Sequence, residues 1–256
     1  MKTYLSWSGG KDSTASIILC YEKGIPLDGI VMSEVMFDHS RNISGENPKH
    51  IKWVYETAIP IIENVFGYKV IIVKDHTDYL SQFYHKITRS KKQDRVGKYT
   101  GFFIGGMCVG NRDLKMRPLK KFFKSVGEHT QIVGIAVDEP KRLARLQKSN
   151  KRSILAEYNI TEEMTYDICR KYNLLSPTYQ DKSRGGCWFC PNQGYKEFAS
   201  LKKEYPLLWG ELKTLSKSDN LASKNFKYGE TFEEVEKKVD MINNQLTLFD
   251  LIGDLQ

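Results

Sequence analysis

Residues 5–14, Leu-Ser-Trp-Ser-Gly-Gly-Lys-Asp-Ser-Thr, constrain the fold more than any other segment of the chain. They read as an apolar strand that passes through a Gly-Gly turn directly into a helix. Unpaired N–H groups at a helix start favour a bound anion, and glycine lets that anion approach the backbone closely. The segment therefore predicts a phosphate-binding turn. The alternative is an ordinary capped helix start, with Ser8 or Asp12 as the cap.

Strand and helix patterns alternate through the first half of the chain. Apolar, β-branched strands are expected at 4–7, 29–36, 69–73 and 131–135, and helices at 14–22 and 48–67, the second capped by Asn47 and kinked at Pro60. This alternation predicts an α/β fold with a doubly wound, Rossmann-like, five-stranded parallel sheet. Ligands of such sheets collect at the carboxyl ends of the strands, which is where the turn at Gly9 and Gly10 would lie.

The rest of the chain reads as a mostly helical C-terminal appendage. Thr161 is expected to cap one helix, further helices are expected at 195–203 and 206–215, and Thr231 with Glu234 forms a capping box for a last helix. The predicted boundaries are a nucleotide-binding domain at 1–155, a helical and cysteine-loop region at 156–229, and a helix with tail at 230–256. The basic stretch 86–98 and the aromatic, glycine-rich stretch 99–106 read as an insertion or mobile flap rather than core.

The composition is that of a soluble globular protein, with 40% hydrophobic and 27% charged residues. No apolar run reaches the roughly 18 residues that would span a bilayer, and the N-terminus enters a strand without a signal-peptide core. Five cysteines, an odd number with one close pair, fit a reducing compartment. The protein is expected to stay in the cytoplasm and away from the membrane.

The net charge of +8 is unevenly distributed. Residues 111–152 hold twelve Lys or Arg residues against four acidic ones. Such an excess predicts an anionic partner, either nucleotide phosphates or the backbone of a nucleic acid. A merely solvated helix face is the alternative.

The pair Cys187-x-x-Cys190 lies between Gly185-Gly186 and Pro191, which frees the backbone to wrap both sulfurs around one centre. Cys108, also beside glycines, is the best third ligand, and three thiolates suit a [4Fe-4S] cluster. A fourth ligand, Cys169 or His129, would instead suit zinc. A reversible dithiol is the third possibility. Cys169 and Cys20 are otherwise read as core residues.

The turn lacks the Gly-x4-Gly-Lys-Ser/Thr spacing of a Walker loop. Ser8–Ser13 instead resembles the pyrophosphate loop of the adenine nucleotide alpha hydrolase-like superfamily, the PP-loop ATP pyrophosphatases. Within it the chain resembles the phosphoadenosine phosphosulfate reductase family, over about residues 2–195. The segments that carry this resemblance are Gly45–His50, Cys108–Pro118 with Leu114 and Lys115, Gly134–Glu139 with Arg142, and Arg184–Pro191. The resemblance implies that ATP is bound and cleaved between its α and β phosphates.

The resemblance also implies which residues hold the nucleotide. These are Ser6, Ser8, Gly9, Gly10, Lys11, Asp12, Ser13, Ser33, Glu34, Gly134 and Asp138. Lys11 would neutralise charge that grows on the leaving pyrophosphate, and Asp12 would link the protein to Mg2+. Arg112, Lys115 and Arg142 could clamp phosphates or an acidic substrate, with a solvated surface role as the alternative.

One departure from the family decides which branch the chain resembles. The sulfonucleotide reductases act through a C-terminal Glu-Cys-Gly-type nucleophile, whereas this chain has no cysteine after Cys190. The Pro191-Asn192-Gln193 sequence that follows looks more like the phage and DNA sulfur-modification branch, whose members are thought to activate a substrate with ATP and hand it sulfur.

The tail holds a last motif. Gln245-Leu246-Thr247-Leu248-Phe249 resembles the peptide by which bacterial proteins enter the pocket of the replication sliding clamp. Extended peptides with two apolar anchors suit groove binding. The alternative is that these residues pack the last helix onto the body.

Taken together, these features favour an ATP-dependent enzyme that adenylates a substrate, with Lys11, Asp12, Cys187 and Cys190 as its catalytic residues. The cysteine centre would store or deliver sulfur from a donor, and the basic surface would present a nucleic acid. The alternatives are a thiol-dependent reductase of adenylyl sulfate or phosphoadenylyl sulfate, and a non-catalytic nucleotide-binding adaptor recruited to the clamp.

Overall fold

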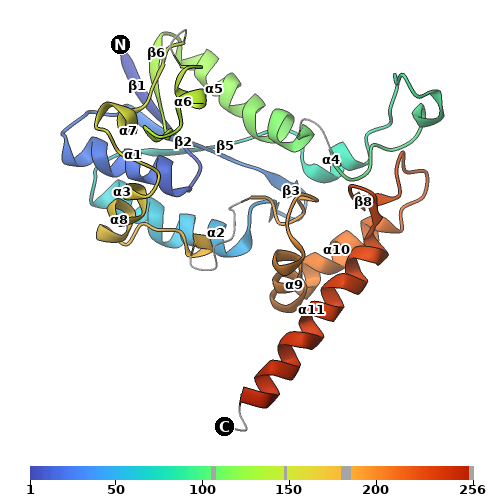
Figure 1. The fold of residues 1–256 in the computed structure, drawn as a ribbon. Helices are drawn as coiled ribbons and strands as arrows, with labels where there is room; N and C mark the ends of the chain where they lie inside the picture. The colour runs from blue at the N-terminus through green and yellow to red at the C-terminus, as the bar shows by residue number, and fades with distance from the viewer. Residues whose placement is uncertain (105–107, 147–148, 180–185, 254–256) are drawn as a thin grey trace.

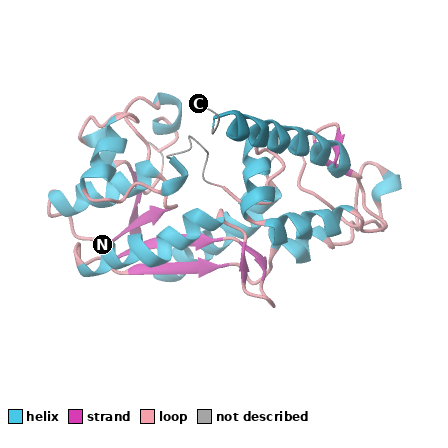
Figure 2. Cartoon of the chain, turned by 90° about the horizontal axis from the view of Figure 1, so that it is seen from below, coloured by secondary structure: helices cyan, strands magenta, loops and turns pink. Residues whose placement is uncertain are grey.

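The computed structural model describes residues 1–104, 108–146, 149–179 and 186–253, with side chains up to residue 245. The described part forms two lobes, a sheet lobe and a helical lobe, each built around its own hydrophobic core (Figure 1). Figure 2 shows the same two lobes from below, with the strands of the central sheet confined to one of them.

A five-stranded parallel sheet forms the centre of the sheet lobe. Its strands are β1 (Lys2–Trp7), β2 (Gly29–Glu34), β5 (Val70–Lys74), β6 (His129–Val133) and the short β7 (Lys151–Arg152). Their order is β5-β2-β1-β6-β7, so the order reverses between β1 and β6. The predicted doubly wound sheet is confirmed, and the turn after β1 lies at the switch point where such sheets bind ligands.

Helices cover both faces of the sheet. On one face α1 (Lys11–Glu22) packs against α7 (Ile154–Glu157) and α8 (Met164–Lys171). On the other face α5 (Arg117–Val126) packs against β2 and β5. The face is set by strand alternation, since Leu5 and Trp7 of β1 join the α1 side whereas Tyr4 packs with Phe123 of α5. A short helix, α6 (Pro140–Leu143), follows the end of β6.

The predicted helix at 48–67 is present but interrupted. It consists of α2 (Pro48–Trp53), a π-helical turn η1 (Val54–Ala58) and α3 (Ile59–Asn64). Pro60 has no N–H to donate to the carbonyl four residues earlier, and a wider turn just before it accommodates the loss. The predicted cap is confirmed, because the Asn47 side chain accepts hydrogen bonds from the backbone of Lys49 and His50.

The predicted strand at 29–36 ends two residues early. Val35 bonds away from the sheet, because its carbonyl accepts from Gly45 N at 2.7 Å and its N–H donates to the Glu46 carboxylate at 3.4 Å. The chain then enters a separate two-stranded ribbon of β3 (Met36–Asp38) and β4 (Ile43–Ser44). This exit carries the polypeptide from the sheet lobe into the helical lobe.

The helical lobe is assembled from distant segments. Its elements are α4 (Tyr79–Phe83), η2 (Gln93–Arg95), π-helical η3 (Gly110–Met116), η4 (Pro177–Tyr179), α9 (Tyr195–Glu204), α10 (Pro206–Ser216), β8 (Asn225–Lys227), β9 (Glu230–Thr231) and α11 (Phe232–Gly253), of which η3 and η4 lie toward the sheet lobe. Phe102 and Phe103 are buried in its core at 5% and 9% exposure. The expectation that residues 99–106 are flap rather than core is therefore wrong for these two, because their rings pack on Phe83 and Tyr79; residues 105–106 lie outside the described part.

The last helix begins as predicted. It continues through the tail motif, which was expected to be an extended peptide. Thr231 and Glu234 exchange capping-box hydrogen bonds, and Phe232, Val235 and Val239 are buried along one stripe. The helix runs to Gly253 and projects from the body (Figure 1), so the backbone of Gln245, Leu246, Leu248 and Phe249 is helical rather than extended. The side chains from Leu246 onward lie outside the described part.

Each of the two cores combines segments that are far apart in the sequence. Residues 154–174, in α7 and α8, pack with α1 in the sheet lobe, whereas Val35, Phe37 and Tyr79 pack in the helical lobe. Among the described helices, none is both long enough and apolar enough to cross a membrane.

Candidate functional site

The turn between β1 and α1 has a backbone conformation that requires glycine. Gly9 has a φ of 70°, and a Cβ placed on it would lie 2.3 Å from Cε1 of His50. A side chain at this position would therefore be strained and would also clash. Glycine is thus required at residue 9 by the backbone and by His50, and the approach of an anion stays a prediction.

Serine hydroxyls hold the turn in shape. Ser13 Oγ donates to Gly10 O at 2.9 Å and accepts from Ser8 N at 3.2 Å, and Gly10 N donates to Ser8 Oγ at 3.3 Å. The amides of Gly9, Asp12 and Ser13 donate to no acceptor in the described part of the chain. The start of α1 thus presents free N–H groups at the switch point of the sheet, as an anion site needs.

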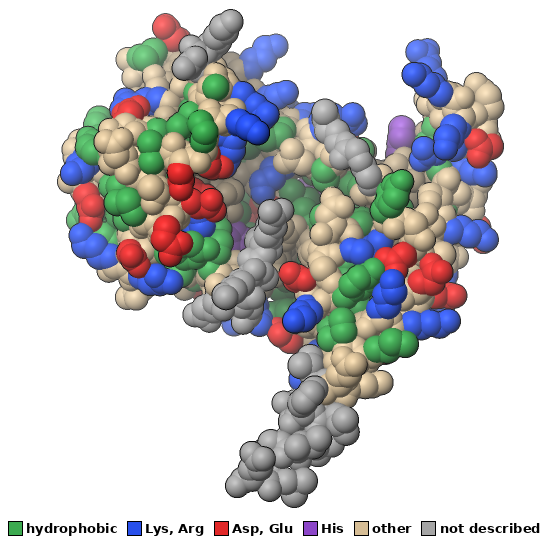
Figure 3. Space-filling view, viewed as in Figure 1, with side chains coloured by type: hydrophobic (Ala, Val, Ile, Leu, Met, Phe, Trp, Pro, Cys, Tyr) green, Lys and Arg blue, Asp and Glu red, His purple; other side chains and the backbone are tan. Residues whose placement is uncertain are grey.

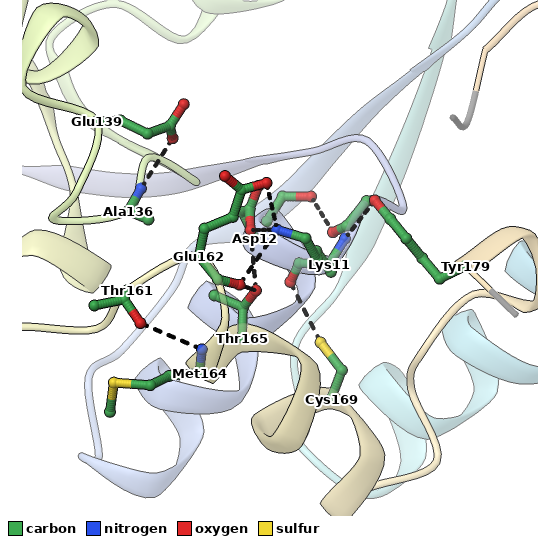
Figure 4. A network of polar contacts seen from close by, with 12 residues as sticks. Lys11, Asp12, Ala136, Glu139, Thr161, Glu162, Met164, Thr165, Cys169 and Tyr179 are labelled. Carbon is green, nitrogen blue, oxygen red and sulfur yellow. Dashed lines mark hydrogen bonds and ion pairs between the residues drawn. The ribbon is translucent and has the colours of Figure 1, made fainter. Parts of the chain in front are cut away.

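Lys11 is almost fully buried, with 4% exposure. Its ammonium donates to Asp12 Oδ1 at 2.7 Å and to Glu162 Oε1 at 3.0 Å (Figure 4). Burial by itself would lower the pKa of Lys11, but these hydrogen bonds outweigh it and the pKa lies above its usual value. Lys11 therefore stays charged beside two carboxylates at the mouth of the turn.

Residues from far along the chain complete this network (Figure 4), and the sequence analysis missed them. Lys11 N donates to the hydroxyl of Tyr179 at 3.1 Å, and Thr165 Oγ1 donates to Asp12 Oδ1 at 3.0 Å. Tyr179 thus accepts from one N–H of the helix start, and no acceptor among the residues that the structure describes takes its own hydroxyl proton. Thr165 and Glu162 follow the correctly predicted cap at Thr161, whose Oγ1 accepts from Met164 N at 3.4 Å, but nothing in their spacing points to residue 11.

The segment after β6 touches the turn. A Cβ on Gly134 would lie 2.5 Å from Ser13 N, so glycine is needed where these two segments meet. Asp138 accepts a hydrogen bond from Glu162 N at 3.0 Å and is thereby tied to the same network. Arg142 pairs with Glu139, which also accepts from Ala136 N, so Arg142 is not aimed at the turn by this contact.

The ends of β1 and β2 carry the other predicted contacts. Ser6 Oγ accepts from Gln131 Nε2 at 2.6 Å. Glu34 is 3% exposed and accepts from the Tyr55 hydroxyl at 2.6 Å and from Lys74 at 3.0 Å. Ser33 Oγ is buried and has no hydrogen-bond partner in the described structure, which leaves one hydroxyl free at the carboxyl end of β2.

His50 forms the wall behind the turn. Its Nε2 contacts Ser8 O at 3.2 Å and its Nδ1 contacts Ser176 Oγ at 2.8 Å. Burial lowers the pKa of His50, so the ring is neutral near pH 7. A neutral ring that donates from Nε2 and accepts at Nδ1 suits both contacts.

The three cysteines predicted to form one centre all lie on segments of the helical lobe. Burial, followed by the charge of Glu46, raises the pKa of Cys187 well above its usual value, and the charges of Cys190 and Cys108 raise it further. Cys190 is half-buried and Cys108 is exposed at the start of η3. Gln193 Nε2 donates to Cys187 O at 2.6 Å and Lys227 Nζ donates to Pro191 O at 2.7 Å, which fixes the cysteine loop.

Tyr79 lies between the segments that carry these thiols. Its ring packs on Phe189, between the paired cysteines, at 3.9 Å between ring centroids, and on Phe103 at 4.8 Å. Its hydroxyl is buried and has no hydrogen-bond partner in the described structure. Burial and then the charges of Cys187, Cys190 and Cys108 raise the pKa of Tyr79. A buried hydroxyl without an acceptor would donate a hydrogen bond to any group that binds beside the thiols.

Within the described residues no group of three or more His, Cys, Asp or Glu side chains is placed to hold one ion. By residue type, three thiolates suit a [4Fe-4S] cluster, whereas a tetrahedral zinc site needs a fourth ligand. The unpaired Tyr79 hydroxyl is a polar group that a cofactor bound there would face. The cluster therefore stays a prediction from the donor set.

Both predicted fourth ligands are wrong. Cys169 lies on α8 in the sheet lobe, where its thiol donates to Lys11 O at 3.3 Å and burial raises its pKa to about 12. His129 is the first residue of β6 and so lies at the amino ends of the parallel strands. There its Nδ1 contacts Gly127 O at 2.6 Å and its ring stacks on Phe123. Neither residue can reach the cysteine loop, because both belong to the packing of the sheet lobe.

The other two residues of the predicted clamp, Lys115 and Arg112, have different partners. Lys115 Nζ lies 3.6 Å from Glu46 Oε1, and that carboxylate first of all raises the pKa of Lys115, with the charge of Cys187 adding to it. This pair therefore stands between η3 and the cysteine loop. Arg112 instead bonds its neighbour Asp113 through two contacts of 2.7 Å at the surface.

A cavity of about 520 Å3 adjoins the cysteine loop. It lies between the start of α2, the segment 188–194, α9 and α11, and Asn47, Thr178, Trp188 and Tyr205 are among its lining residues. Thr178 is the neighbour of Tyr179, and Trp188 is the neighbour of Cys187. The cavity is therefore lined by the residue that precedes Tyr179 and by the residue that follows Cys187. Figure 3 shows the hollow between the two lobes.

No protein-family model matches this chain, and no curated protein matches its sequence. Among solved structures, it is similar to the U34-tRNA thiolase NcsA from Methanococcus maripaludis with its [4Fe-4S] cluster. The match has 18% sequence identity and a TM-score of 0.42, and covers 86% of this chain and 73% of that one. Identity and overlap at this level leave the function to be argued from the residues of the chain itself.

Proposed function

We propose that the protein binds ATP at the turn of residues 8–13, cleaves it between the α and β phosphates to adenylate an acceptor group on a nucleic acid, and lets sulfur displace the AMP. In the first step an acceptor oxygen bonds to the α-phosphorus and the bond to the pyrophosphate oxygen breaks. In the second step a sulfide equivalent takes the place of that oxygen, which leaves with AMP. No electron is gained or lost overall.

The observation that carries this proposal is the helix start at the switch point of the sheet. The amides of Gly9, Asp12 and Ser13 have no acceptor in the described part of the chain, and the buried ammonium of Lys11 belongs to the same helix start. Such donors stabilise charge that develops on a leaving phosphate. Asp12 would hold Mg2+ together with phosphate oxygens, since Mg2+ is usually bound through one or two carboxylates plus substrate phosphates. Ser33 Oγ, which lacks a partner, would be left for the nucleoside.

The sequence favours sulfur chemistry over a redox dithiol, because the C-terminal cysteine nucleophile of the resembled reductases has no counterpart after Cys190. Cys108, Cys187 and Cys190 would hold the cluster, which supplies an open iron site where a sulfide can bind. The residues of the chain set its surroundings, because Lys115 with Glu46 and the hydroxyl of Tyr79 are the polar groups beside it.

The acceptor group would enter the cavity beside the cysteine loop. A volume of about 520 Å3 is within the usual range for small-ligand sites, and Trp188, Tyr195 and Tyr205 give it aromatic walls. Enzymes that modify a base move it into a pocket of this kind and stack it on aromatic rings. A cytoplasmic location is expected for such an enzyme.

Exchange of labelled pyrophosphate into ATP tests the first step, with single- and double-stranded DNA and transfer RNA as acceptors. We expect exchange that depends on Lys11 and Asp12, followed by loss of AMP and a thiolated product when sulfide is added under anaerobic conditions. Release of sulfite from an adenylyl sulfate would instead establish the reductase. Tight nucleotide binding with no cleavage for any acceptor would establish the adaptor.

A further inference from the structure

The segment 86–98, here called the basic flap, projects from the helical lobe. It carries Lys86, Arg89, Lys91, Lys92, Arg95 and Lys98 against the single acid Asp94. Figure 3 shows Lys and Arg side chains gathered at this projection, at the upper right of the molecule. Four of the six cations are exposed, and Arg95 and Lys98 are half-buried.

These cations are clustered on one short segment and none of them is paired in the described structure. In the described part of the chain, none of the six takes part in an ion pair, and the Nε of Arg95 is buried without a hydrogen-bond partner. Outside the flap most described arginines pair with a carboxylate, namely Arg41, Arg112, Arg117, Arg142, Arg152 and Arg170. The basic region predicted at 111–152 is therefore partly neutralised, whereas the flap keeps its full charge.

The flap is held in position at its base. Ile87 N donates to Lys98 O and Gly97 N donates to Ile87 O, each at 2.9 Å. Tyr99 N donates to Asn220 O at 2.9 Å, and Asn220 Nδ2 donates to Gly97 O at 3.1 Å. These bonds tie the flap to the helical lobe, so its like charges are kept together although they repel one another.

We propose that the basic flap is the surface on which the sugar–phosphate backbone of the nucleic acid docks. This proposal rests on the proposed function, because it assigns a place to the acceptor strand. Uncompensated cations on a fixed projection suit a row of phosphates, whose binding releases counterions. The chain from the flap leads directly through Phe102 and Phe103 to the surroundings of Tyr79, so the docked strand and the thiol centre belong to the same lobe.

Two features favour a nucleic acid over a membrane. Membrane-surface segments combine cations with several large apolar anchors, whereas Val96 is the one large hydrophobic residue exposed in the flap. Tyr84, just before the flap, is 41% exposed and offers a ring on which a base can stack.

Charge reversal in the flap tests this proposal. The triple variant R89E, K91E and K92E changes exposed side chains that make no hydrogen bond in the described structure. Its matched control is K203E, K217E and K237E, which alters the net charge equally at exposed, unpaired positions on α9, directly after α10 and on α11. Fluorescence anisotropy with a labelled 30-nucleotide single strand, of RNA and of DNA, would measure affinity between 0.05 and 0.3 M salt.

We expect the flap variant to bind about 100-fold more weakly at 0.1 M salt and its slope of log K against log salt to fall by roughly two to three, since each phosphate contact contributes about 0.7 to 0.9. The control should stay within about threefold of the unaltered protein. Equal losses in both variants, or no loss in the flap variant, would overturn the proposal. Stronger binding of the flap to vesicles with 30% phosphatidylserine than to either strand would also overturn it.

The same samples separate this proposal from the proposed function. Nucleotide binding and pyrophosphate exchange without nucleic acid should be unchanged in the flap variant. Flap-dependent strand binding without any ATP cleavage would support the surface and refute the enzyme. ATP cleavage by a protein that binds no strand would support the enzyme and refute the surface.

Discussion

The nucleotide turn and the thiol centre are built in opposite ways. At the turn, a buried cation meets two carboxylates and the serines bond within the turn itself, so the side chains are satisfied and free amides are left. At the thiol centre, two half-buried thiols, the exposed Cys108 and the Tyr79 hydroxyl come from three distant segments, and the hydroxyl has no partner in the described structure. The difference teaches that the turn is preorganised by its own hydrogen bonds, whereas the proposed thiol centre would need a bound group to complete it.

The largest effect is expected from Lys11→Ala. Removing this ammonium leaves Asp12 and Glu162 without their partner and removes the cation nearest the leaving phosphate. Turnover of ATP should fall about 100- to 1,000-fold. The iron content should not change, because the two sites are independent.

The control for that change is Lys171→Ala, which removes an exposed pair with Glu22 and should leave turnover unaltered. A Lys11 variant that retains full cleavage would contradict the role assigned to the turn.

The next effect is expected from Gly9→Ala. The new Cβ would be strained at a φ of 70° and would press on His50 at 2.3 Å. Affinity for ATP, measured by titration calorimetry, should fall about 100-fold, since strain and displacement together cost on the order of 3 kcal/mol. Gly24→Ala is the matched control, because Gly24 has a φ of 62° with nothing within 4 Å. Equal affinities for both variants would show that the turn adapts to its ligand.

Serine substitutions of Cys108, Cys187 and Cys190 should affect the thiol centre and leave the nucleotide turn unchanged. C108S, C187S and C190S should each reduce the iron content of anaerobically purified protein from about four atoms per chain to below one. Variants C20S and C169S should keep their iron, because those thiols are buried in the sheet lobe. Loss of iron in the Cys169 variant, or zinc in place of iron, would contradict the account of this centre.

A smaller effect is expected from pH through His50. Its pKa in the folded protein is lowered by burial, so the unfolded chain takes up the proton first as the pH falls. Stability should therefore be highest above pH 6.5 and should fall below it by at most about 1.4 kcal/mol per pH unit. Urea unfolding at pH 7.5 and 5.5 would measure this, and the difference should shrink in His50→Gln. An unchanged difference would place the sensitivity elsewhere.

The smallest effect is expected from Tyr79→Phe. In metal-free protein the hydroxyl is buried without a partner, so removing it should raise the free energy of unfolding by about 1 kcal/mol. In the iron-loaded protein the gain should vanish and the visible spectrum or reduction potential should shift. A gain of equal size in both forms would show that the hydroxyl does not face the centre.

The features that could be predicted from the sequence are those built from residues close together along the chain. The strand, the Gly-Gly turn and the start of α1 are contiguous, so their residue types indicate both the fold and the anion site. The capping box of Thr231 and Glu234 and the helices at 195–203 and 206–215 are predicted correctly for the same reason.

The contacts that join distant segments could not be predicted in this way. Tyr179 and Thr165 reach the turn from more than 150 residues away, and no pattern near either of them indicates it. Residue type alone suggested His129 and Cys169 as ligands, but their elements place them at the sheet. The convergence of Cys108 with Cys187 and Cys190 rests on their residue type and neighbouring glycines, and it stays a prediction.

The identity of the products from ATP labelled at the α-phosphate tests the central claim most directly. In the presence of Mg2+, an acceptor nucleic acid and sulfide, we predict labelled AMP and unlabelled pyrophosphate, with both lost in Lys11→Ala. Labelled ADP with free phosphate, or labelled ATP that stays intact while tightly bound to the turn, would contradict the account.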